Sequence, residues 1–375
     1  MQLESHIERI TKTADILNES ILSLDTDINA AKYRGDLLLK VALAYYIQDD
    51  MDKAHSFIAQ AKQMPGMKGM FREMLDFWEK ILNDGNSFET SLGAMNVLQR
   101  LVFEIMFYYS AVLYHELPQE IREAVSCVSH GNTTFLSRGM YKNKVVPQLA
   151  PGFDVNEGLF YFDISGRRLY YAANEAREVA FAHNFIQNNE QVPHSPHLYF
   201  TEDFCPRAGD VFCDIGAGEA NASFAQVDVC DKIYIFEGDA KWEKPLAATF
   251  APYMDKVTFV HKMVSDAPDD DVVTLDDYFG EAKVDFLKMD VEGYELRVLL
   301  GAEGLLAANK KIKLCVCTYH KGEDVNEIKS FLEARGFTCE FSEGFMVFAD
   351  DEMFHEGSDP AYPYFRRGLI RAWRE

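Results

Sequence analysis

Apolar residues recur at three- and four-residue steps through the first third of the chain, a period typical of amphipathic helices. Residues 36–65 show one helix, a short acidic turn and a second helix, with small alanines where the two helices would cross. The spacing is similar to one tetratricopeptide repeat, but no convincing second copy follows and a solenoid needs several, so a generic helical hairpin is favoured. The most apolar window, Leu101–Leu117, contains Glu104 and is too short to span a bilayer. We therefore expect a buried helix there, within a helical domain over residues 1–135.

Beyond the helical third, the period of the pattern changes to two. The run GLFYFDISGRRLYYA alternates apolar and polar residues around a Ser-Gly pair, which predicts a β-hairpin. A predicted helix over 174–188 follows, and then a proline-containing loop. His194 and His197 lie in that loop, where lone histidines are more often surface residues than ligands. We therefore predict a hairpin-and-helix connector over residues 136–198.

From Tyr199 onward, continuous apolar runs alternate with helical stretches. Strands of this kind, joined by helices, belong to a parallel sheet that is covered on both faces. The last two runs, FTCEFSE and GFMVFAD, are separated by a short turn, so we expect them to pair antiparallel. The sequence therefore predicts a doubly wound α/β domain with an antiparallel last strand over residues 199–352. A basic and aromatic tail over 353–375 follows it.

The charge of the chain limits the classes of partner. Its 375 residues carry 37 basic and 60 acidic side chains, a formal charge of −23. Such a field repels phosphate backbones and anionic lipid surfaces, so we expect neither nucleic acid nor a membrane among the partners. The cysteines show no CxxC pair and no zinc spacing, which favours reduced thiols. Because the polar start of the sequence also does not resemble a signal peptide, we expect a cytoplasmic protein.

Ligands of a parallel sheet bind beyond the carboxyl ends of its strands. Gly216 and Gly218 follow the first strand there and allow a tight turn close to a ligand. Glu237 ends the second strand, where a carboxylate can accept hydrogen bonds from both hydroxyls of a ribose. The neighbouring Asp214 and Glu219 would repel the pyrophosphate of NAD but suit the ammonium group of a methionine moiety. The charge of the loop therefore favours S-adenosylmethionine over a dinucleotide.

Three carboxylates, those of Asp290, Glu292 and Glu295, lie where the fourth strand passes into a helix. Glu295 can be an ordinary residue of an acidic helix start. Asp290 at the strand tip faces the glycine loop, so a functional role is favoured for it. A metal site is the minority interpretation because no further Asp or Asn ligand stands nearby, and we expect no metal.

The run FLKMDVEGYELRVLL, with the Gly-Ala that follows it, closely resembles the signature of the FkbM family of S-adenosylmethionine-dependent methyltransferases. Shorter supporting runs are DIGA, FEG, VSD, TLDDY and TYHKGED, so the resemblance covers roughly residues 199–349. It implies a Rossmann-like class I methyltransferase fold. It also implies methyl transfer to hydroxyls of sugars, glycans or polyketide-type natural products.

The resemblance also implies a set of cofactor-binding residues. The sequence departs from many relatives at Ala220 and Asn221, where they have a further glycine and a serine or threonine. By position, the implied residues are Asp214, Gly216 and Gly218 for the methionine part, Glu237 for the ribose, Asp290 beside the sulfonium, and Ser265.

Methyl transfer to a hydroxyl needs alignment of the reacting atoms and one base for the hydroxyl proton. His320 ends the fifth strand on the same rim as Asp290, and imidazole titrates near neutral pH. We therefore predict that these two residues are catalytic, with His320 as the base. The alternative is that His320 only caps the strand end and hydrogen-bonds Asp324. The neighbours expected to bind substrate are Glu292, Tyr319 and Lys321.

The leading hypothesis is thus a methyltransferase that acts on a small-molecule or carbohydrate hydroxyl. The alternative is a non-catalytic binding or scaffold protein, in which the helical hairpin is an interaction module and the α/β domain is vestigial. A nicotinamide-dependent oxidoreductase is less favoured because of the acidic loop. The helices of residues 1–135 are expected either to cover the substrate side of the sheet or to form a homodimer contact.

Overall fold

The computed structural model describes residues 34–64, 69–111, 117–130, 135–136, 149–321, 324–347 and 364–374. The chain divides into two compact units. Residues 1–140, 344–355 and 359–365 belong to the first, and residues 141–343, 356–358 and 366–375 to the second. The helical pattern before residue 34, most of the predicted tail and two residues of the TYHKGED run lie outside the described residues.

The first unit is built from helices around an aromatic core. Trp78 is fully buried and donates its indole N–H to the Ser110 hydroxyl at 2.8 Å. Glu104, in the apolar window, is buried and accepts a hydrogen bond from the Tyr364 hydroxyl at 2.6 Å. The predicted buried helix is confirmed over residues 101–111, and residues 112–116 of the window lie outside the described residues. Within the described ranges, no helix combines the length and apolar character needed to cross a membrane. The described elements of this unit are α2 (Arg34–Ile47), α3 (Met51–Gln63), α4 (Met70–Asn83), α5 (Phe88–Ala94), α6 (Val97–Ala111), α7 (Gln119–Ser129), β1 (Phe135–Leu136) and β13 (Phe345–Met346).

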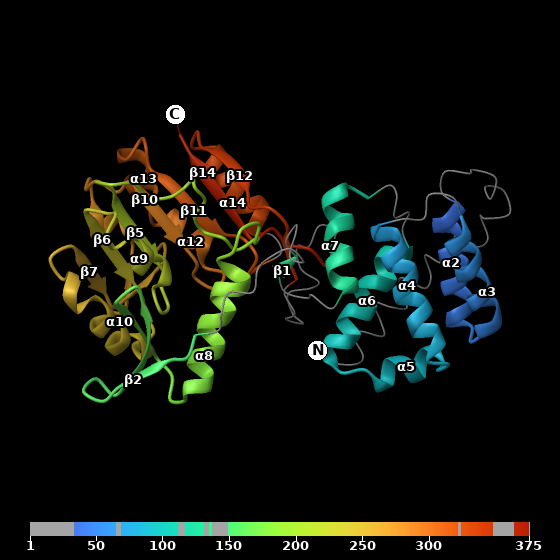
Figure 1. Cartoon of the computed structure of the whole chain (residues 1–375). Helices are drawn as coiled ribbons and strands as arrows, with labels where there is room; N and C mark the ends of the chain where they lie inside the picture. Colours follow the sequence, from blue (N-terminus) through green and yellow to red (C-terminus); the bar gives the residue numbers. More distant parts are fainter. Residues whose placement is uncertain are drawn as a thin grey trace. The chain divides into compact units, whose positions relative to one another are not determined.

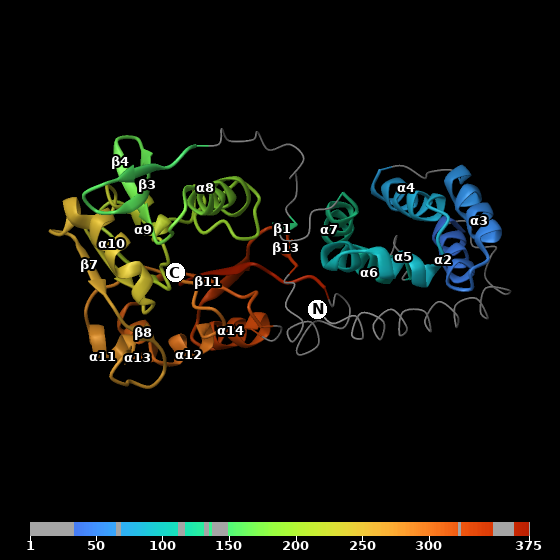
Figure 2. The same cartoon turned by 90° about the horizontal axis from the view of Figure 1, so that it is seen from below.

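The second unit begins with a small antiparallel sheet of β2 (Gly152–Asp154), β3 (Leu159–Ile164) and β4 (Arg167–Tyr171). The pairing of β3 with β4 confirms the predicted hairpin. It packs against α10 (Glu243–Phe250), and the Tyr170 backbone N–H donates to the Thr249 hydroxyl on that helix at 3.0 Å (Figure 2). The predicted helix after the hairpin is present as α8 (Ala176–Phe185), which continues into a single π-helical turn, η3 (Ile186–Glu190).

The largest sheet of the described residues has seven strands in the order β12-β14-β11-β10-β5-β6-β7 (Figure 1). All neighbours pair parallel except β14, which runs antiparallel to both β11 and β12. The strands are β5 (Val211–Ile215), β6 (Lys232–Phe236), β7 (Val257–Val260), β10 (Phe286–Met289), β11 (Lys313–Cys317), β12 (Thr338–Phe341) and β14 (Leu369–Trp373). The predicted α/β class is therefore confirmed.

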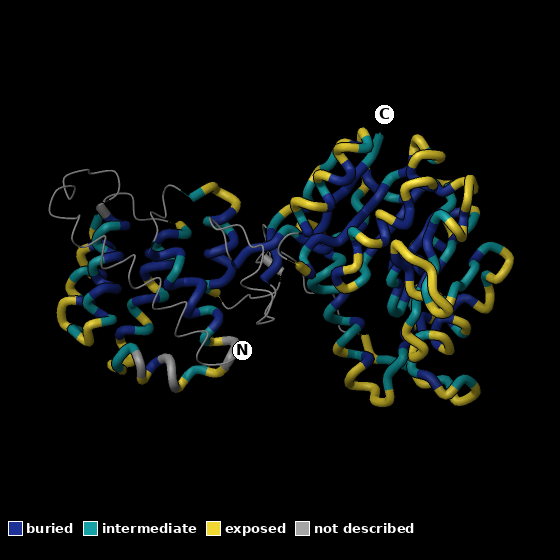
Figure 3. Tube along the Cα trace, turned by 180° about the vertical axis from the view of Figure 1, so that it is seen from behind, coloured by how far each residue is buried: buried dark blue, intermediate teal, exposed yellow. Residues whose placement is uncertain are grey.

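Helices cover both faces of this sheet. Leu287 and Leu314 pack in one apolar cluster, whereas their neighbours Phe286 and Cys315 pack in another. The central strands β10 and β11 are therefore almost entirely buried, within the buried segments of Figure 3, whereas the edge strands β7 and β12 are partly exposed. On one face lie α8, α9 (Asn221–Gln226) and α10 (Glu243–Phe250); on the other lie α11 (Leu275–Phe279), α12 (Glu295–Leu300), α13 (Glu303–Ala308) and α14 (Asp324–Glu333) (Figure 2). A short parallel pair, β8 (Met263–Val264) and β9 (Val272–Val273), follows β7.

The predicted pairing of the last two strands is wrong. FTCEFSE forms β12, but its partner is β14, and GFMVFAD contributes β13, which pairs with β1 in the first unit. The reason is length: β14 has five residues and pairs on both edges, whereas β13 has two. Residues 369–373 are thus a strand of the sheet, which corrects their assignment to a basic tail. Arg366 donates to the backbone carbonyls of Tyr319 and His320, so its charge stabilises the end of β11.

Candidate active site

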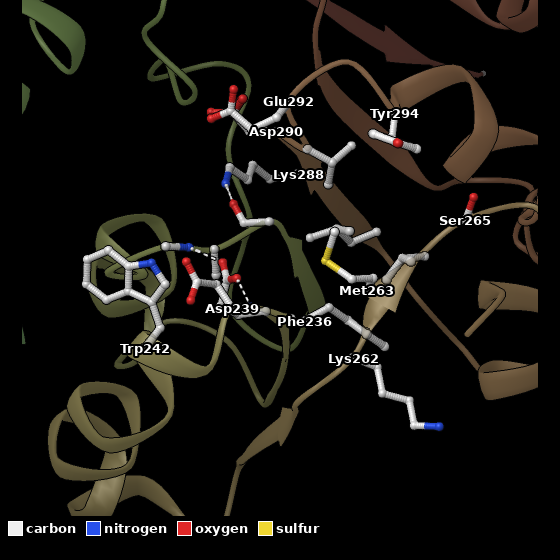
Figure 4. A pocket seen from close by; sticks show the side chains of 18 of the residues that line it. Phe236, Asp239, Trp242, Lys262, Met263, Ser265, Lys288, Asp290, Glu292 and Tyr294 are labelled. Atoms are coloured by element: carbon white, nitrogen blue, oxygen red, sulfur yellow. Dashed lines mark hydrogen bonds between the residues drawn. The ribbon is translucent and has the colours of Figure 1, made fainter. Parts of the chain in front are cut away.

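A cavity of about 1060 Å³ lies beyond the carboxyl ends of β5, β6 and β10 (Figure 4). The loops that follow these strands form its walls, together with η3 and the segment before β5. Most of the predicted site residues therefore come together there, as expected for a parallel sheet. The predicted residues that line it are Gly216, Gly218, Glu237, Ser265, Asp290, Glu292 and Tyr319.

The glycine turn after β5 touches the tip of β10. Gly216 has a φ of 69°, and a β-carbon at this position would lie 1.9 Å from the carbonyl oxygen of Asp290. Only glycine tolerates both this conformation and this approach. Gly218 also has a positive φ, and its N–H donates to Glu237 Oε2 at 2.8 Å. The turn is therefore held against both neighbouring strands.

Glu237 is fixed at the end of β6. Its second oxygen, Oε1, accepts a hydrogen bond from the Asp239 N–H at 2.8 Å. Each carboxylate oxygen has another lone pair for a ligand hydroxyl. Phe236, Met263 and Trp242 also line the cavity, and Figure 4 shows Phe236 and Met263 on one side of Asp239 and Trp242 on the other. Ser265 lines the same end of the cavity and contacts Asp266, with 3.1 Å between Oγ and Oδ1.

Lys288, which lies within a strand and was not predicted as a site residue, lines the cavity from the middle of β10. Its Nζ donates to the Gly216 carbonyl at 2.8 Å and lies 3.0 Å from Asp214 Oδ1. Burial would lower the pKa of Lys288, but the carboxylates of Asp214 and Asp290 raise it overall, so the side chain stays charged. Asp214 is fully buried behind the lysine and also accepts a hydrogen bond from Ser223, and it does not line the cavity. The expected direct contact of Asp214 with the cofactor is corrected accordingly.

Two further carboxylates, those of Glu190 and Glu219, line the cavity near Lys288. Burial, reinforced by the negative charge of Glu190, raises the pKa of Glu219 to about 7. Burial likewise raises the pKa of Glu190. Because both carboxylates disfavour each other's charge, this part of the cavity favours a cationic ligand group.

Asp290 is the centre of a group of polar side chains. It accepts a hydrogen bond from the Tyr199 hydroxyl at 2.7 Å, and its Oδ2 lies 3.4 Å from Nε2 of His197. Burial alone would raise the pKa of Asp290, but the hydrogen bond from His197 and the charges of His197, Lys288 and His320 hold it well below its usual range. Asp290 is therefore ionised at neutral pH.

The interpretation of His197 as a surface residue is wrong, whereas His194 is exposed as expected. His197 is 3% exposed and lines the cavity together with Tyr199. Both residues precede the first strand of the sheet, so no strand-end rule selects them. The apolar HLYF run was the available signal, because it indicates a segment that packs against the sheet.

His320 lies beneath Asp290 and outside the cavity lining. Its Nδ1 is 2.9 Å from Glu295 Oε1, and its Nε2 is 3.4 Å from Glu292 Oε2. Burial would lower the pKa of His320, but the hydrogen bond to Glu295 and the nearby carboxylates raise it overall. A raised pKa leaves this imidazole already protonated over more of the neutral pH range, so it is a weaker candidate for accepting the hydroxyl proton. Lys321 also lies outside the lining, and its Nζ donates to the Gly293 carbonyl.

Among the described residues, two triads have possible ligand atoms close enough to hold a metal ion. One is His197, Asp290 and Cys317, and the other is Asp290, Glu295 and His320. Burial raises the pKa of the Cys317 thiol well above its usual value. That no metal takes part stays a prediction.

Comparison with known proteins gives one family match. The family model described as the methyltransferase FkbM domain matches residues 206–339. Among solved structures, a precorrin-6y C5,15-methyltransferase from Geobacter metallireducens has 19% identity and a TM-score of 0.30, over 45% of this chain and 82% of its own. An rRNA methylase from Streptococcus thermophilus has 16% identity and a TM-score of 0.28, over 45% of this chain and 88% of its own. No curated protein matches the chain.

A third similar structure was solved with S-adenosyl-L-methionine. It is a putative tRNA (m1A22) methyltransferase from Streptococcus pneumoniae, with 12% identity and a TM-score of 0.29, over 44% of this chain and 65% of its own.

Proposed function

We propose that this chain, whose residues 206–339 are an FkbM methyltransferase domain, methylates a hydroxyl group of a sugar, glycan or secondary metabolite. The family makes the domain a methyltransferase with S-adenosylmethionine as its cofactor. The order of the seven strands supports a Rossmann-like class I topology. A cytoplasmic location and a homodimer contact through the helices of the first unit are further parts of the proposal.

The observation that carries the proposal is the complementarity of one cavity to three chemically different parts of the cofactor. Aromatic and apolar side chains beside β6 fit an adenine ring. The fixed carboxylate of Glu237 fits a ribose diol. Lys288 and Glu219 offer a cation and an anion for the carboxylate and ammonium groups of the methionine part. When bound, the cofactor supplies an electrophilic methyl group.

The first test is binding. S-adenosylmethionine and its demethylated product, S-adenosylhomocysteine, are expected to raise the melting temperature of the protein. Transfer is then measured as formation of the demethylated product with a panel of hydroxylated sugars, glycosides and polyketide-type compounds. Binding without turnover on the panel would favour the scaffold alternative, and the absence of a melting shift with either ligand would contradict the proposal.

Glu237→Ala is expected to weaken S-adenosylhomocysteine binding roughly 10- to 100-fold. It removes charge-assisted hydrogen bonds, which are worth about 1.5–3 kcal/mol. Isothermal titration calorimetry measures the change. The matched control is Glu281→Ala, because Glu281 is exposed and lies outside the cavity lining. Equal affinities of the two variants would place the ribose elsewhere.

The affinity for S-adenosylhomocysteine is expected to fall about tenfold between pH 8 and pH 6. The pKa of Glu219 is raised to about 7, so the side chain is ionised and attracts the ligand's ammonium group above that pH, and becomes neutral below it. The groups that face Glu219 are Glu190 from η3, Lys288 from β10, Asp214 from β5 and Tyr171 from β4. Titration calorimetry across this range should give a flat profile for Glu219→Gln; an unchanged slope would assign the dependence to another group.

A further inference from the structure

The η3 turn is an unusual segment at the wall of the cavity. The Gln191 N–H donates to the Ile186 carbonyl five residues earlier, at 2.9 Å, which is the hydrogen bond of a π-helix. Isolated π turns are rare and recur at functional sites. This one directs both Ile186 and Glu190 into the cavity lining. The extra residue per turn thus places a carboxylate where the preceding α-helix would not.

Glu190 stands at the end of a row of polar groups that crosses this wall. Its Oε2 lies 3.7 Å from Nδ1 of His197, and Nε2 of the same ring lies 3.4 Å from Asp290 Oδ2. Tyr199 donates to that oxygen of Asp290 at 2.7 Å. An imidazole therefore stands between two carboxylates that both line the cavity.

The two carboxylates of this row differ in basicity. Burial raises the pKa of Glu190, partly offset by His197, whereas the charges around Asp290 hold its pKa low. A carboxylate with a raised pKa takes a proton more readily, so Glu190 is the better base of the pair. Asp290, being ionised, stabilises positive charge on the imidazole between them.

We propose that Glu190 is the catalytic base that removes the proton of the acceptor hydroxyl, with His197 and Asp290 as positioning residues. This assignment rests on the proposed function. The acceptor oxygen forms the new O–CH₃ bond as the methyl–sulfur bond breaks, and the electron pair of that bond stays on sulfur. The hydroxyl proton passes to the Glu190 carboxylate and from there to water.

The first experiment needs no acceptor. It compares the affinities of S-adenosylhomocysteine and of sinefungin, in which a C–NH₃⁺ group replaces the methylated sulfonium. A carboxylate beside the transferred methyl attracts that ammonium by about 1 kcal/mol even at the dielectric constant of water. Glu190→Gln is therefore expected to weaken the binding of sinefungin at least about fivefold more than it weakens the binding of S-adenosylhomocysteine. The control is Glu178→Gln, on the exposed side of α8. Equal changes for both ligands would overturn the assignment.

The second experiment uses the acceptor found with the panel above. Glu190→Gln is expected to lower kcat at least about 100-fold and to remove the acidic limb of the pH profile, with Glu190→Asp partly active. His197→Gln should shift the pH at which this acidic limb occurs, which the loss of a merely structural role would not do. The control is His194→Gln in the same loop, which should have the kcat and pH profile of the wild type. Wild-type kcat in Glu190→Gln would overturn the assignment while leaving the methyltransferase function intact. If the wild-type protein does not bind the cofactor, the proposed function itself is contradicted.

Discussion

Lys288→Met is expected to lower the free energy of unfolding by about 3–5 kcal/mol, the usual effect of removing one partner from a buried ion pair. The lysine is 2% exposed, and its removal leaves the fully buried carboxylate of Asp214 without its cation. The Gly216 carbonyl also loses its donor. Differential scanning calorimetry should show a fall of the melting temperature by roughly 10 °C.

A double variant distinguishes the effect of the unpaired charge on stability from the effect of lost packing. In Asp214→Asn/Lys288→Met no buried charge is left unpaired, so the double variant should be more stable than Lys288→Met alone. Lys283→Met is the matched control, because that lysine is largely exposed and its ion pair with Asp285 is at the surface. A melting temperature of Lys288→Met equal to that of the control would show that the buried pair contributes nothing to stability.

Strand ends were the predictable part of the site. Gly216, Glu237 and Asp290 each follow a parallel strand, and the carboxyl ends of such strands meet at one edge. To predict that these three residues meet, it is therefore enough to recognise the strands and their direction. The pairing of Lys288 with Asp214 requires the register as well. These two residues are direct partners across β10 and β5, so their side chains share a face of the sheet.

The remaining features depend on long-range packing that no local pattern encodes. β14 follows β11 only after a long stretch of chain, and it enters the sheet between β12 and β11. A local pattern instead predicts that β12 pairs with the next strand along the chain. His197 and Glu190 precede the sheet, and only the packing of that segment across the strand ends brings them to Asp290. Residues supplied from outside the strand–helix units thus form part of the cavity wall.

Gly216→Ala is expected to abolish S-adenosylhomocysteine binding and to destabilise the second unit by more than about 3 kcal/mol. A non-glycine residue at a φ of 69° costs about 1 kcal/mol by itself. Most of the destabilisation comes from the collision of the new methyl group with the Asp290 carbonyl, since neither backbone can yield without breaking the pairing of β5 with β10. A shift of the turn would also separate Gly218 from Glu237, which removes the contact that fixes the ribose carboxylate.

Gly218→Ala provides the control that isolates the collision. Gly218 has a similar positive φ, but a β-carbon there would meet no atom within 4 Å, so only the backbone strain of about 1 kcal/mol applies. Calorimetric unfolding and titration with S-adenosylhomocysteine should therefore show a severe defect in Gly216→Ala and a mild one in Gly218→Ala. If the two variants behave alike, conformational strain alone explains the need for glycine, and the contact between the turn and the β10 tip is not what shapes the cofactor end of the cavity.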